Sequence, residues 1–302
     1  MARSPFQLVP LSSVSEEARI DLLGRCFDRK IDADWYRWKY RGSPWGATHG
    51  VIGVDEDGPA GVVHSIPWPL FIGETLVTGT RMLDSGTVER VRRRGLFRAM
   101  VADEVESHRS QLDRLSFCTT TPNSTAALQR VGATVLEFVS NYTVGLRRLR
   151  LAGARLELTT PADAVRHYAS PAPDPFRLRT AWSSEALAWR FDPRSGRQYR
   201  AAVLREADVS TGLVYRLESR RGVRLIAAIL GWGTHRGNEA LLAAVARAER
   251  APIVLDLGRS PLIKVSRGRT FMCVWDFSPR SRPQPTVSRA WRFELVDAEG
   301  VM

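Results

Sequence analysis

The residues best suited to chemistry form one basic segment at positions 87–98, which reads TVERVRRRGLFR. The pattern predicts the end of a strand, a loop carrying Arg92, Arg93 and Arg94, and a helix that begins at Gly95. The first amides of a helix have no intrahelical partner and, together with the helix dipole, attract anions. Glycine lets the backbone approach a ligand closely, and arginines pair with phosphate oxygens. The segment is therefore suited to a phosphate or a pyrophosphate.

A solvated basic turn that caps the helix is the other interpretation of the same residues. Two nucleotide-binding classes are excluded, because the sequence contains neither the GxxxxGK[ST] pattern nor the GxGxxG pattern.

The elements that position this segment follow from hydrophobic periodicity and turn residues. Helices are predicted at residues 15–27, 34–40, 95–108 and 124–130, with Asp34 as the N-cap of the second. Strands are predicted at residues 50–54, 61–66, 80–88, 115–120 and 134–144, with hairpin turns at 55–58 and 73–74. This order is typical of a layered α+β domain.

An internal repeat relates the two halves of the chain. One offset aligns four pairs of similar residues: Trp38 and Trp189, Lys39 and Arg190, Tyr40 and Phe191, and Gly61 and Gly212. In each copy the aromatic block precedes an apolar run, a polar turn, the glycine and a second apolar run. The pattern predicts two copies of one fold.

Proline-rich stretches suggest the boundaries. Residues 170–175 read SPAPDP and cannot form the interior of a helix. We expect a first domain at residues 1–150, a proline-rich linker region at 151–178 and a second domain at 179–302. Residues 278–285 are expected to form a loop before a last strand at 290–296.

The segment Arg92-x-x-Gly95-x-Phe97, placed after a strand, resembles the coenzyme A loop of the GNAT acyltransferase superfamily. That family has Arg or Gln, two residues, Gly, one residue, and then Gly or Ala, so Phe97 is a departure at the last position. Asn123 and Ala126 are similar to the Asn-x-x-Ala that opens the next family helix. The resemblance covers residues 5–145 directly and the second half through the repeat. It implies an α+β fold of two tandem GNAT-like domains, each a mixed, mostly antiparallel sheet flanked by helices.

The resemblance also implies the donor and its contacts. The donor would be an acyl-CoA, most simply acetyl-CoA, and no metal would be needed. Backbone amides of the loop would bind the pyrophosphate, while the strand end and Asn123 would contact the pantetheine arm. The donor-binding residues expected in this way are Thr87, Val88, Glu89, Arg92, Arg93, Arg94, Gly95, Leu96, Phe97, Arg98 and Asn123.

Direct attack of an amine on the thioester needs a base and stabilisation of the developing oxyanion. Three carboxylates are candidates for the base. Asp84 lies just before the strand end, although it could equally pair with an arginine, and Glu89 could simply offset the arginine cluster. The terminal carboxylate of Met302 is the third, because the resemblance includes tandem members that use that group. The family often has a tyrosine acid where this chain has Leu128, but a thiolate can leave unaided.

The second copy differs at the corresponding loop. Residues 234–238 read THRGN and lack the Arg-x-x-Gly pattern, so we expect a degenerate copy that does not bind coenzyme A. It would instead cover the acceptor side of the first copy, since clefts between domains are common ligand sites. The dense aromatic residues of the first copy either pack against its sheet or wall the acceptor pocket; they are Trp35, Trp38, Tyr40, Trp45 and Trp68.

Composition limits the partners. The chain has 302 residues and a net charge of +12, but only three lysines, and such an arginine skew is typical of GC-rich coding. We do not expect a nucleic-acid partner, although tRNA stays open. No apolar run could span a bilayer and the N-terminus has no secretory signal, so we expect a cytoplasmic protein that does not bind a membrane. The three cysteines include no CxxC pair, so we expect no zinc site.

The sequence therefore predicts an acyl-CoA-dependent N-acyltransferase that acts on a primary amine of a small molecule, sugar or amino acid. One alternative is a Fem-type aminoacyl-tRNA-dependent transferase, in which the positive charge would bind tRNA. Another is an acyl-CoA-binding sensor without catalysis. A homodimer is compatible with the sequence.

Overall fold

The computed structural model describes residues 5–110, 115–144, 155–172, 174–205, 210–256, 264–277, 283–292 and 295–298. We refer to residues 5–144 as the first half and to residues 155–298 as the second half. The strands of the first half are β1 (Gln7–Pro10), β2 (His49–Asp55), β3 (Gly58–Ile72), β4 (Thr75–Thr87), β5 (Leu115–Thr120) and β6 (Thr134–Val144). Those of the second half are β7 (Arg155–Thr159), β8 (Leu178–Thr180), β9 (Arg200–Arg205), β10 (Ser210–Arg220), β11 (Val223–Trp232), β12 (Ile253–Asp256) and β13 (Lys264–Asp276).

Helices flank these strands in both halves. The first half has α1 (Glu16–Phe27), α2 (Ala33–Arg41), α3 (Leu96–Ser110) and α4 (Pro122–Gln129), with short 3-10 turns η1 (Leu11–Ser13) and η2 (Glu89–Val91). The second half has α5 (Pro161–Val165), α6 (Ser184–Arg190), α7 (His235–Ala248) and α8 (Leu295–Ala298), with 3-10 turns η4 (Pro193–Ser195) and η5 (Ser288–Ala290).

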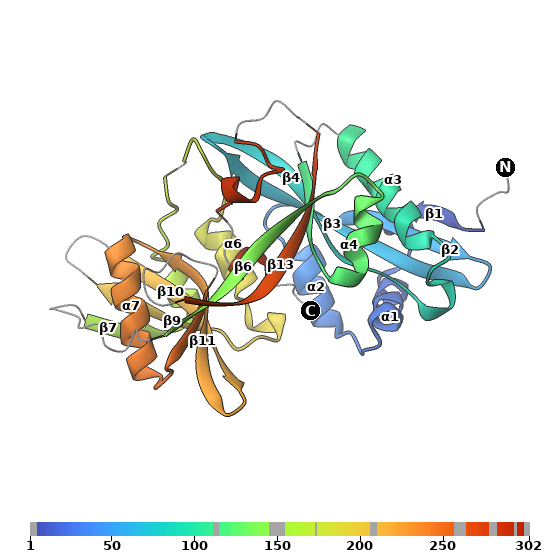
Figure 1. The fold of residues 1–302 in the computed structure, drawn as a ribbon. Helices are drawn as coiled ribbons and strands as arrows, with labels where there is room; N and C mark the ends of the chain where they lie inside the picture. Colours follow the sequence, from blue (N-terminus) through green and yellow to red (C-terminus); the bar gives the residue numbers. More distant parts are fainter. Residues whose placement is uncertain are drawn as a thin grey trace.

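One continuous sheet runs through the molecule in the order β1-β2-β3-β4-β5-β13-β6-β12-β11-β10-β9-β7, with β8 added to β3. Most neighbours are antiparallel, and the β4–β5 and β11–β12 pairs are parallel. Strands β6 and β13 are exchanged: β13 lies between β5 and β6, and β6 lies between β13 and β12. Figure 1 shows these two strands side by side at the junction of the two lobes. The mixed, mostly antiparallel α+β architecture predicted from the sequence is confirmed.

The two copies of the repeat contact each other through a pair of tryptophans. Trp38 and Trp189 lie 151 residues apart in the chain, and their rings stack with centroids 5.8 Å apart. The Trp38 indole N–H donates to the carbonyl of Trp189 at 2.8 Å, and the Trp189 indole N–H donates to the carbonyl of Trp38 at 2.9 Å. This reciprocal pair is what a local two-fold relation between the copies requires.

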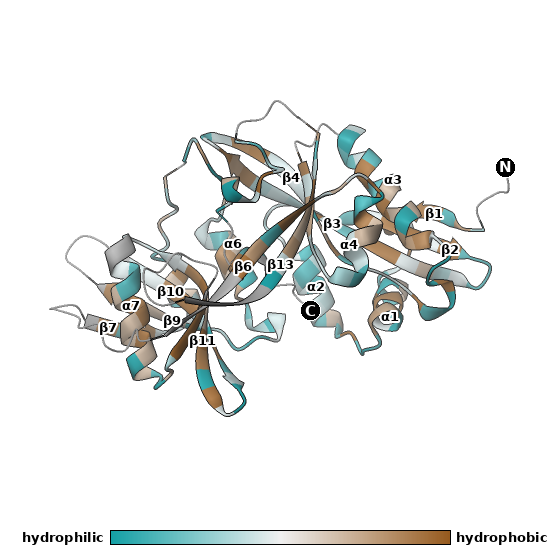
Figure 2. Cartoon of the chain, viewed as in Figure 1, coloured by the Kyte–Doolittle hydropathy of each residue, from teal (hydrophilic) through white to brown (hydrophobic). Residues whose placement is uncertain are grey.

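Each of the two repeated glycines lies against a large buried side chain, which comes from α3 in the first half and from β11 in the second. A Cβ at Gly61 would lie 2.6 Å from the Met100 methyl group, and a Cβ at Gly212 would lie 1.9 Å from the Trp232 ring. Each glycine therefore lets a large buried side chain approach its strand, β3 in the first half and β10 in the second. Figure 2 shows the apolar residues concentrated along the central strands and on the sheet-facing sides of the helices.

The halves share a hydrophobic core. One cluster joins Trp68 and Phe117 of the first half to Leu187, Val214 and Trp232 of the second. The predicted division at residues 150 and 178 stays a prediction. Within that linker region the structure places β7, which pairs with β9, and α5.

The structure corrects several predicted elements. The last strand predicted at residues 290–296 is wrong, because Ala290 ends η5 and Leu295 begins α8, with a single bridge between Trp291 and Leu178. An apolar run this short does not distinguish a strand from a helical turn. The N-cap of α2 is Asp32, whose carboxylate accepts from the Trp35 amide at 2.9 Å, and not Asp34.

Strand β3 is longer than predicted. The sequence prediction ended it at Ile66 because Pro67 and Pro69 follow. In the structure β2 begins at His49, opposite Ser65, so the prolines lie where that edge of β3 is not paired with β2. There the missing N–H breaks no ladder bond, and the Pro69 carbonyl accepts from the Ala181 amide at 2.9 Å.

Candidate functional site: a cleft where two parallel strands separate

Strands β4 and β5 pair over a short stretch and then separate. Their register includes Thr80 opposite Ser116 and Arg81 opposite Phe117, after which β4 continues to Thr87 without a β5 partner. A cavity of about 890 Å³ opens along the gap. This volume lies within the range of small-molecule and cofactor sites.

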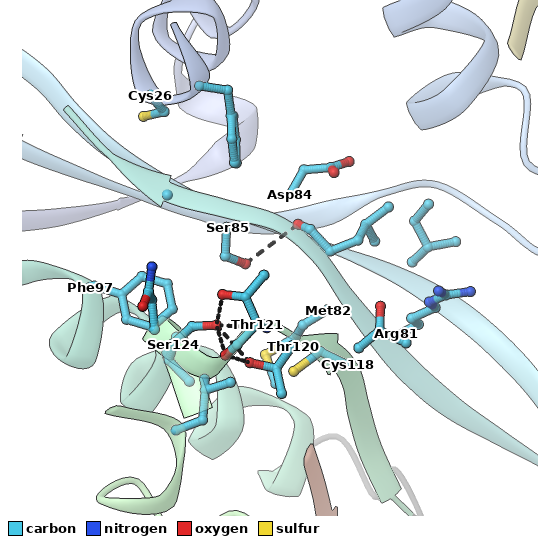
Figure 3. A pocket seen from close by; sticks show the side chains of 18 of the residues that line it. Cys26, Arg81, Met82, Asp84, Ser85, Phe97, Cys118, Thr120, Thr121 and Ser124 are labelled. Carbon is cyan, nitrogen blue, oxygen red and sulfur yellow. Dashed lines mark hydrogen bonds between the residues drawn. The ribbon is translucent and has the colours of Figure 1, made fainter. Parts of the chain in front are cut away.

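The cavity is lined by both halves of the molecule. Strand β4 supplies residues 81–87, and β5 with the start of α4 supplies Cys118, Thr119, Thr120, Thr121, Asn123 and Ser124. The second half supplies Trp189 and Arg190 from α6, and Arg269 and Thr270 from β13. Figure 3 shows Thr120, Thr121 and Ser124 joined by hydrogen bonds on one rim, with Asp84 and Ser85 on β4 opposite them.

The basic loop lies at one end of this cavity. Its backbone turns sharply, because φ is 64° at Arg93 and 91° at Gly95. A positive φ is the reason for glycine at position 95, since a Cβ there would meet nothing within 4 Å. Helix α3 follows at once, and its first bond back to the loop runs from the Ala99 amide to the Gly95 carbonyl at 3.0 Å. The amides before Ala99 are therefore the donors that a helix leaves without an intrahelical partner.

The predicted donor-binding residues fall into two groups. Thr87, Arg92, Phe97 and Asn123 line the cavity. The remaining members are not among the lining residues of the cavity, and their predicted contacts with a donor stay a prediction. Among them Leu96 is buried in the core of the first half, and the Val88 amide donates to the Ala60 carbonyl at 2.9 Å. Glu89, Arg93, Arg94 and Arg98 are exposed side chains.

The opposite end of the cavity contains a buried charged cluster. A β-bulge interrupts the β3–β4 register between Val62 and His64, and Asp84 lies in it with a φ of 45°. The Asp84 carboxylate accepts from the Lys39 ammonium and, at 2.5 Å, from the Tyr40 hydroxyl. The side chains of Lys39 and Asp84 are 1% and 5% exposed.

Burial and pairing set the protonation of this cluster. Burial works to raise the pKa of Asp84, but Lys39 and Tyr40 overcome it and hold that pKa below its usual range. Burial lowers the pKa of Lys39 to about 8, against the attraction of Asp84. His64, stacked on Tyr40 with ring centroids 4.1 Å apart, has its pKa lowered by burial to about 4. Asp84 is thus ionised and His64 neutral near pH 7.

Two further cations reach this end of the cavity. Arg81 is 3% exposed and lies over the Trp68 ring at 4.6 Å, and Arg190 is 1% exposed. Burial, followed by the charge of Arg190, lowers the pKa of Arg81 to about 10. Within the described part of the chain, the Arg81 Nε atom has no hydrogen-bond partner.

The predicted catalytic carboxylates are not all brought to the cavity. Asp84 lines it, and its partner is a lysine rather than the arginine that the sequence left open. Glu89 is exposed on η2 and is not part of the lining, and Met302 lies outside the described residues. Leu128, where the family often has tyrosine, lines the cavity, and the described lining residues include no tyrosine.

Sequence reasoning missed Lys39, Arg81 and Arg190 as site residues, and it considered Tyr40 only as an aromatic that packs or walls the pocket, not as a donor to Asp84. The repeat did single out Lys39 and Arg190 as aligned residues, and lysine is rare in this chain. A basic residue in an aromatic block at the same place in both copies is the signal that could have identified them.

In the second copy, described side chains occupy the space beside the start of helix α7. Thr234 caps that helix, and its hydroxyl accepts from the Gly237 amide at 3.0 Å. The Thr211 hydroxyl lies 2.4 Å from where a Gly237 Cβ would be, so side chains fill the space beside these amides. A helix whose first amides already donate to its own residues has fewer free N–H donors for a phosphate.

No family model and no curated protein sequence matches the chain, but solved structures do. A conserved protein of unknown function from Enterococcus faecalis V583, described as a probable N-acyltransferase, superposes with a TM-score of 0.71 at 10% identity, over 90% of this chain and 72% of its own. A GCN5-related N-acetyltransferase from Anabaena variabilis has a TM-score of 0.65 at 12% identity, over 90% of this chain and 73% of its own. A tandem GNAT protein from the clavulanic acid biosynthesis pathway has a TM-score of 0.55 at 15% identity, over 91% of this chain and 100% of its own. The fold of this chain is therefore the GNAT fold in tandem, as the sequence predicted.

None of the helices in the described part of the chain has the length and apolar character needed to cross a membrane.

Proposed function

We propose that this chain is an acyl-CoA-dependent N-acyltransferase, with acetyl-CoA as the donor. The observation that carries the proposal is the single cavity that reaches from Arg92 and Phe97, beside the start of α3, to the buried carboxylate of Asp84. The free amides at the start of α3 can bind the phosphates of a donor, and the ionised carboxylate at the other end of the gap can attract an amine acceptor.

The donor would lie along the gap between β4 and β5. The pyrophosphate would face the amides of residues 95–98, with Arg92 beside it. The pantetheine arm would follow β4, whose edge has lost its β5 partner beyond Arg81. Asn123 and the Thr120–Ser124 hydroxyls would provide polar contacts on the other rim.

The acceptor would enter from the α6 side, where Trp38, Trp68 and Trp189 form apolar walls. Among the acceptor classes that the sequence left open, we favour an amino acid. The reason is the unsatisfied Nε of buried Arg81, with Arg190 near it, because a guanidinium of this kind binds a carboxylate. The carboxylate of Asp84 would attract the ammonium group of the same molecule.

In the reaction, the amine lone pair attacks the thioester carbonyl, the nitrogen releases its surplus proton to solvent, the C–S bond breaks, and coenzyme A leaves as a thiolate. Its pKa lies near that of an ordinary thiol, so solvent can supply its proton where Leu128 replaces an acid. The amine must first lose a proton. Asp84 would hold the ammonium and pass its proton to solvent, because its low pKa makes it a weak final acceptor. Lys39 and Tyr40 position that carboxylate.

The test is a turnover assay with acetyl-CoA and three classes of amine: amino acids, amino sugars and polyamines. Free thiol and the mass of the product are measured together. We expect an acetylated amino acid, and a large loss of kcat in Asp84→Asn with little change in the KM for acetyl-CoA. Turnover of polyamines alone would contradict the acceptor assignment.

A second function has one observation in its favour. Leu128, 4% exposed, replaces the usual acid at the cavity, which also suits an acyl-CoA sensor. Acetyl-CoA binding without turnover of any amine would support that function. A parallel titration with bulk tRNA tests the aminoacyl-tRNA alternative, for which binding should weaken steeply with salt.

A further inference from the structure

A cluster of three metal-ligating side chains lies toward the end of α3 that is far from the loop proposed to bind the pyrophosphate. It consists of His49, at the start of β2, and of Glu104 and His108, one turn apart on α3. None of the three lines the cavity between β4 and β5. Sequence spacing did not indicate the cluster, because His49 is distant in the chain from the other two.

The three ligand atoms converge on one point. Nε2 of His108 lies 2.9 Å from Oε1 of Glu104 and 3.1 Å from Nε2 of His49, and the third side of the triangle, from His49 Nε2 to Glu104 Oε1, is 3.6 Å. Tetrahedral Zn²⁺ with bond lengths of about 2.05 Å separates its ligand atoms by roughly 3.3 Å. The observed triangle therefore has the size of one face of a coordination tetrahedron.

Burial differs across the cluster in a way that suits a metal site. The side chains of His108 and Glu104 are 0% and 5% exposed, whereas that of His49 is 36% exposed. The exposed side gives an entry path for an ion and room for a water as the fourth ligand.

An outer contact orients His108. Its Nδ1 lies 2.7 Å from the hydroxyl of Ser116 on β5, which is 0% exposed. Metal-binding histidines usually have such a partner on the second ring nitrogen, which fixes the tautomer. When His108 donates through Nδ1, its Nε2 is a bare acceptor facing the carboxylate oxygen of Glu104 at 2.9 Å. A cation bound between these two acceptors would remove the repulsion between their lone pairs.

We propose that His49, Glu104 and His108 bind one Zn²⁺ ion, with water as the fourth ligand. Two imidazoles and a carboxylate form a donor set that zinc uses in proteins. The ion would join β2 to α3, and through Ser116 it would also involve β5, so it would fix the helix whose other end forms the donor seat. In the opposite tautomer the same residues would form a hydrogen-bonded chain without an ion, and the experiment separates the two.

The experiment uses the full-length, untagged protein. After treatment with a chelator and dialysis, the protein is titrated with Zn²⁺ against a chromogenic chelator, and bound metal is counted by elemental analysis. Co²⁺ serves as a spectroscopic probe of the coordination geometry. We expect one Zn²⁺ per chain and the visible spectrum of four-coordinate Co²⁺.

Variants assign the ligands. His49→Ala and Glu104→Gln should each weaken Zn²⁺ binding at least about 100-fold, and Ser116→Ala should weaken it about 10-fold. Glutamine keeps the shape and hydrogen bonding of Glu104, so a merely hydrogen-bonded cluster would tolerate it. The matched control is His167→Ala, an exposed histidine outside the cluster, which should bind zinc as the parent does.

Two outcomes would overturn the proposal. One is that the parent protein binds no stoichiometric Zn²⁺ at micromolar concentration. The other is that zinc binds equally well to His49→Ala and Glu104→Gln. Circular dichroism of each variant without metal shows whether it is folded, and His49→Ala, on the exposed side, keeps the test valid if Glu104→Gln does not fold.

Discussion

The buried pair of Lys39 and Asp84 gives the most quantitative prediction of this structure. The perturbation is Lys39→Met, which keeps the length of the side chain and removes its charge. Because Asp84 is 5% exposed, the variant leaves a buried carboxylate whose remaining hydrogen-bond donor, among the side chains that the structure describes, is the Tyr40 hydroxyl. The pKa of Asp84 should then rise, since burial works in that direction and Lys39 is the main group that opposes it.

The magnitude follows from the burial of both partners. Removing one member of a buried ion pair costs about 3–5 kcal/mol, against about 0–1 kcal/mol for an exposed pair. Asp84→Asn should cost a similar amount, because it leaves the Lys39 ammonium at 1% exposure beside a neutral amide. Asparagine is the suitable replacement, since it tolerates the φ of 45° at this position. The double variant should cost clearly less than the two single costs together, because no unpaired charge remains.

Urea unfolding of the four proteins at pH 7, followed by tryptophan fluorescence and circular dichroism, measures these free energies. Single costs under about 1 kcal/mol, or strictly additive costs, would refute the assignment of a buried, coupled pair.

Three other predictions follow from buried groups. The pKa of His64 is near 4 in the folded protein and 6.5 in the unfolded chain, so the unfolded chain binds more protons and the free energy of unfolding falls as the pH drops below 6.5. The loss at pH 5 should be about 2 kcal/mol and should be smaller in His64→Gln. An equal pH dependence of the two proteins would contradict this prediction. Trp38→Phe and Trp189→Phe should destabilise the protein by similar amounts of about 1–3 kcal/mol, because each leaves one carbonyl of the reciprocal pair without its donor; a cost from only one of them in urea unfolding would argue against the two-fold relation. Cys26 lies at the wall of the cavity with 6% exposure, and burial raises its pKa to about 12. A thiol reagent at pH 8 should therefore label it much more slowly in the native protein than after unfolding, and equal rates would contradict that burial.

Much of the fold could be predicted from local patterns. Strands at 115–120 and 134–144 have the predicted bounds, because alternating or continuous apolar residues between turn residues mark them clearly. The Trp38 and Trp189 alignment indicated two copies, and the structure brings these residues into contact. What local patterns could not show was the exchange of β6 and β13, since the pairing of distant strands leaves no trace in the periodicity of either one.

The candidate site was predictable only in part. The basic loop and Asn123 follow a short motif, so sequence located the end of the cavity that we propose for the donor, and Asp84 was reached through its place near the end of β4. The role of Lys39 and Arg81 depends on burial, which a bulge and a packed tryptophan create, and neither is visible in the sequence. The three ligands of the proposed zinc site likewise become neighbours only when α3 packs on β2.

The central claim is that the gap between β4 and β5 binds acetyl-CoA through the loop at Gly95. Calorimetric titration of acetyl-CoA into the parent protein, Gly95→Glu and Gly132→Glu tests it directly. Both glycines are exposed, with φ of 91° and 85° and no atom within 4 Å of an added Cβ, so the two variants carry the same backbone strain and the same new charge. Only Gly95 lies in the proposed pyrophosphate seat. We expect micromolar binding to the parent and to Gly132→Glu, with no measurable binding to Gly95→Glu. Equal affinity in all three proteins, or no binding to the parent, would contradict it.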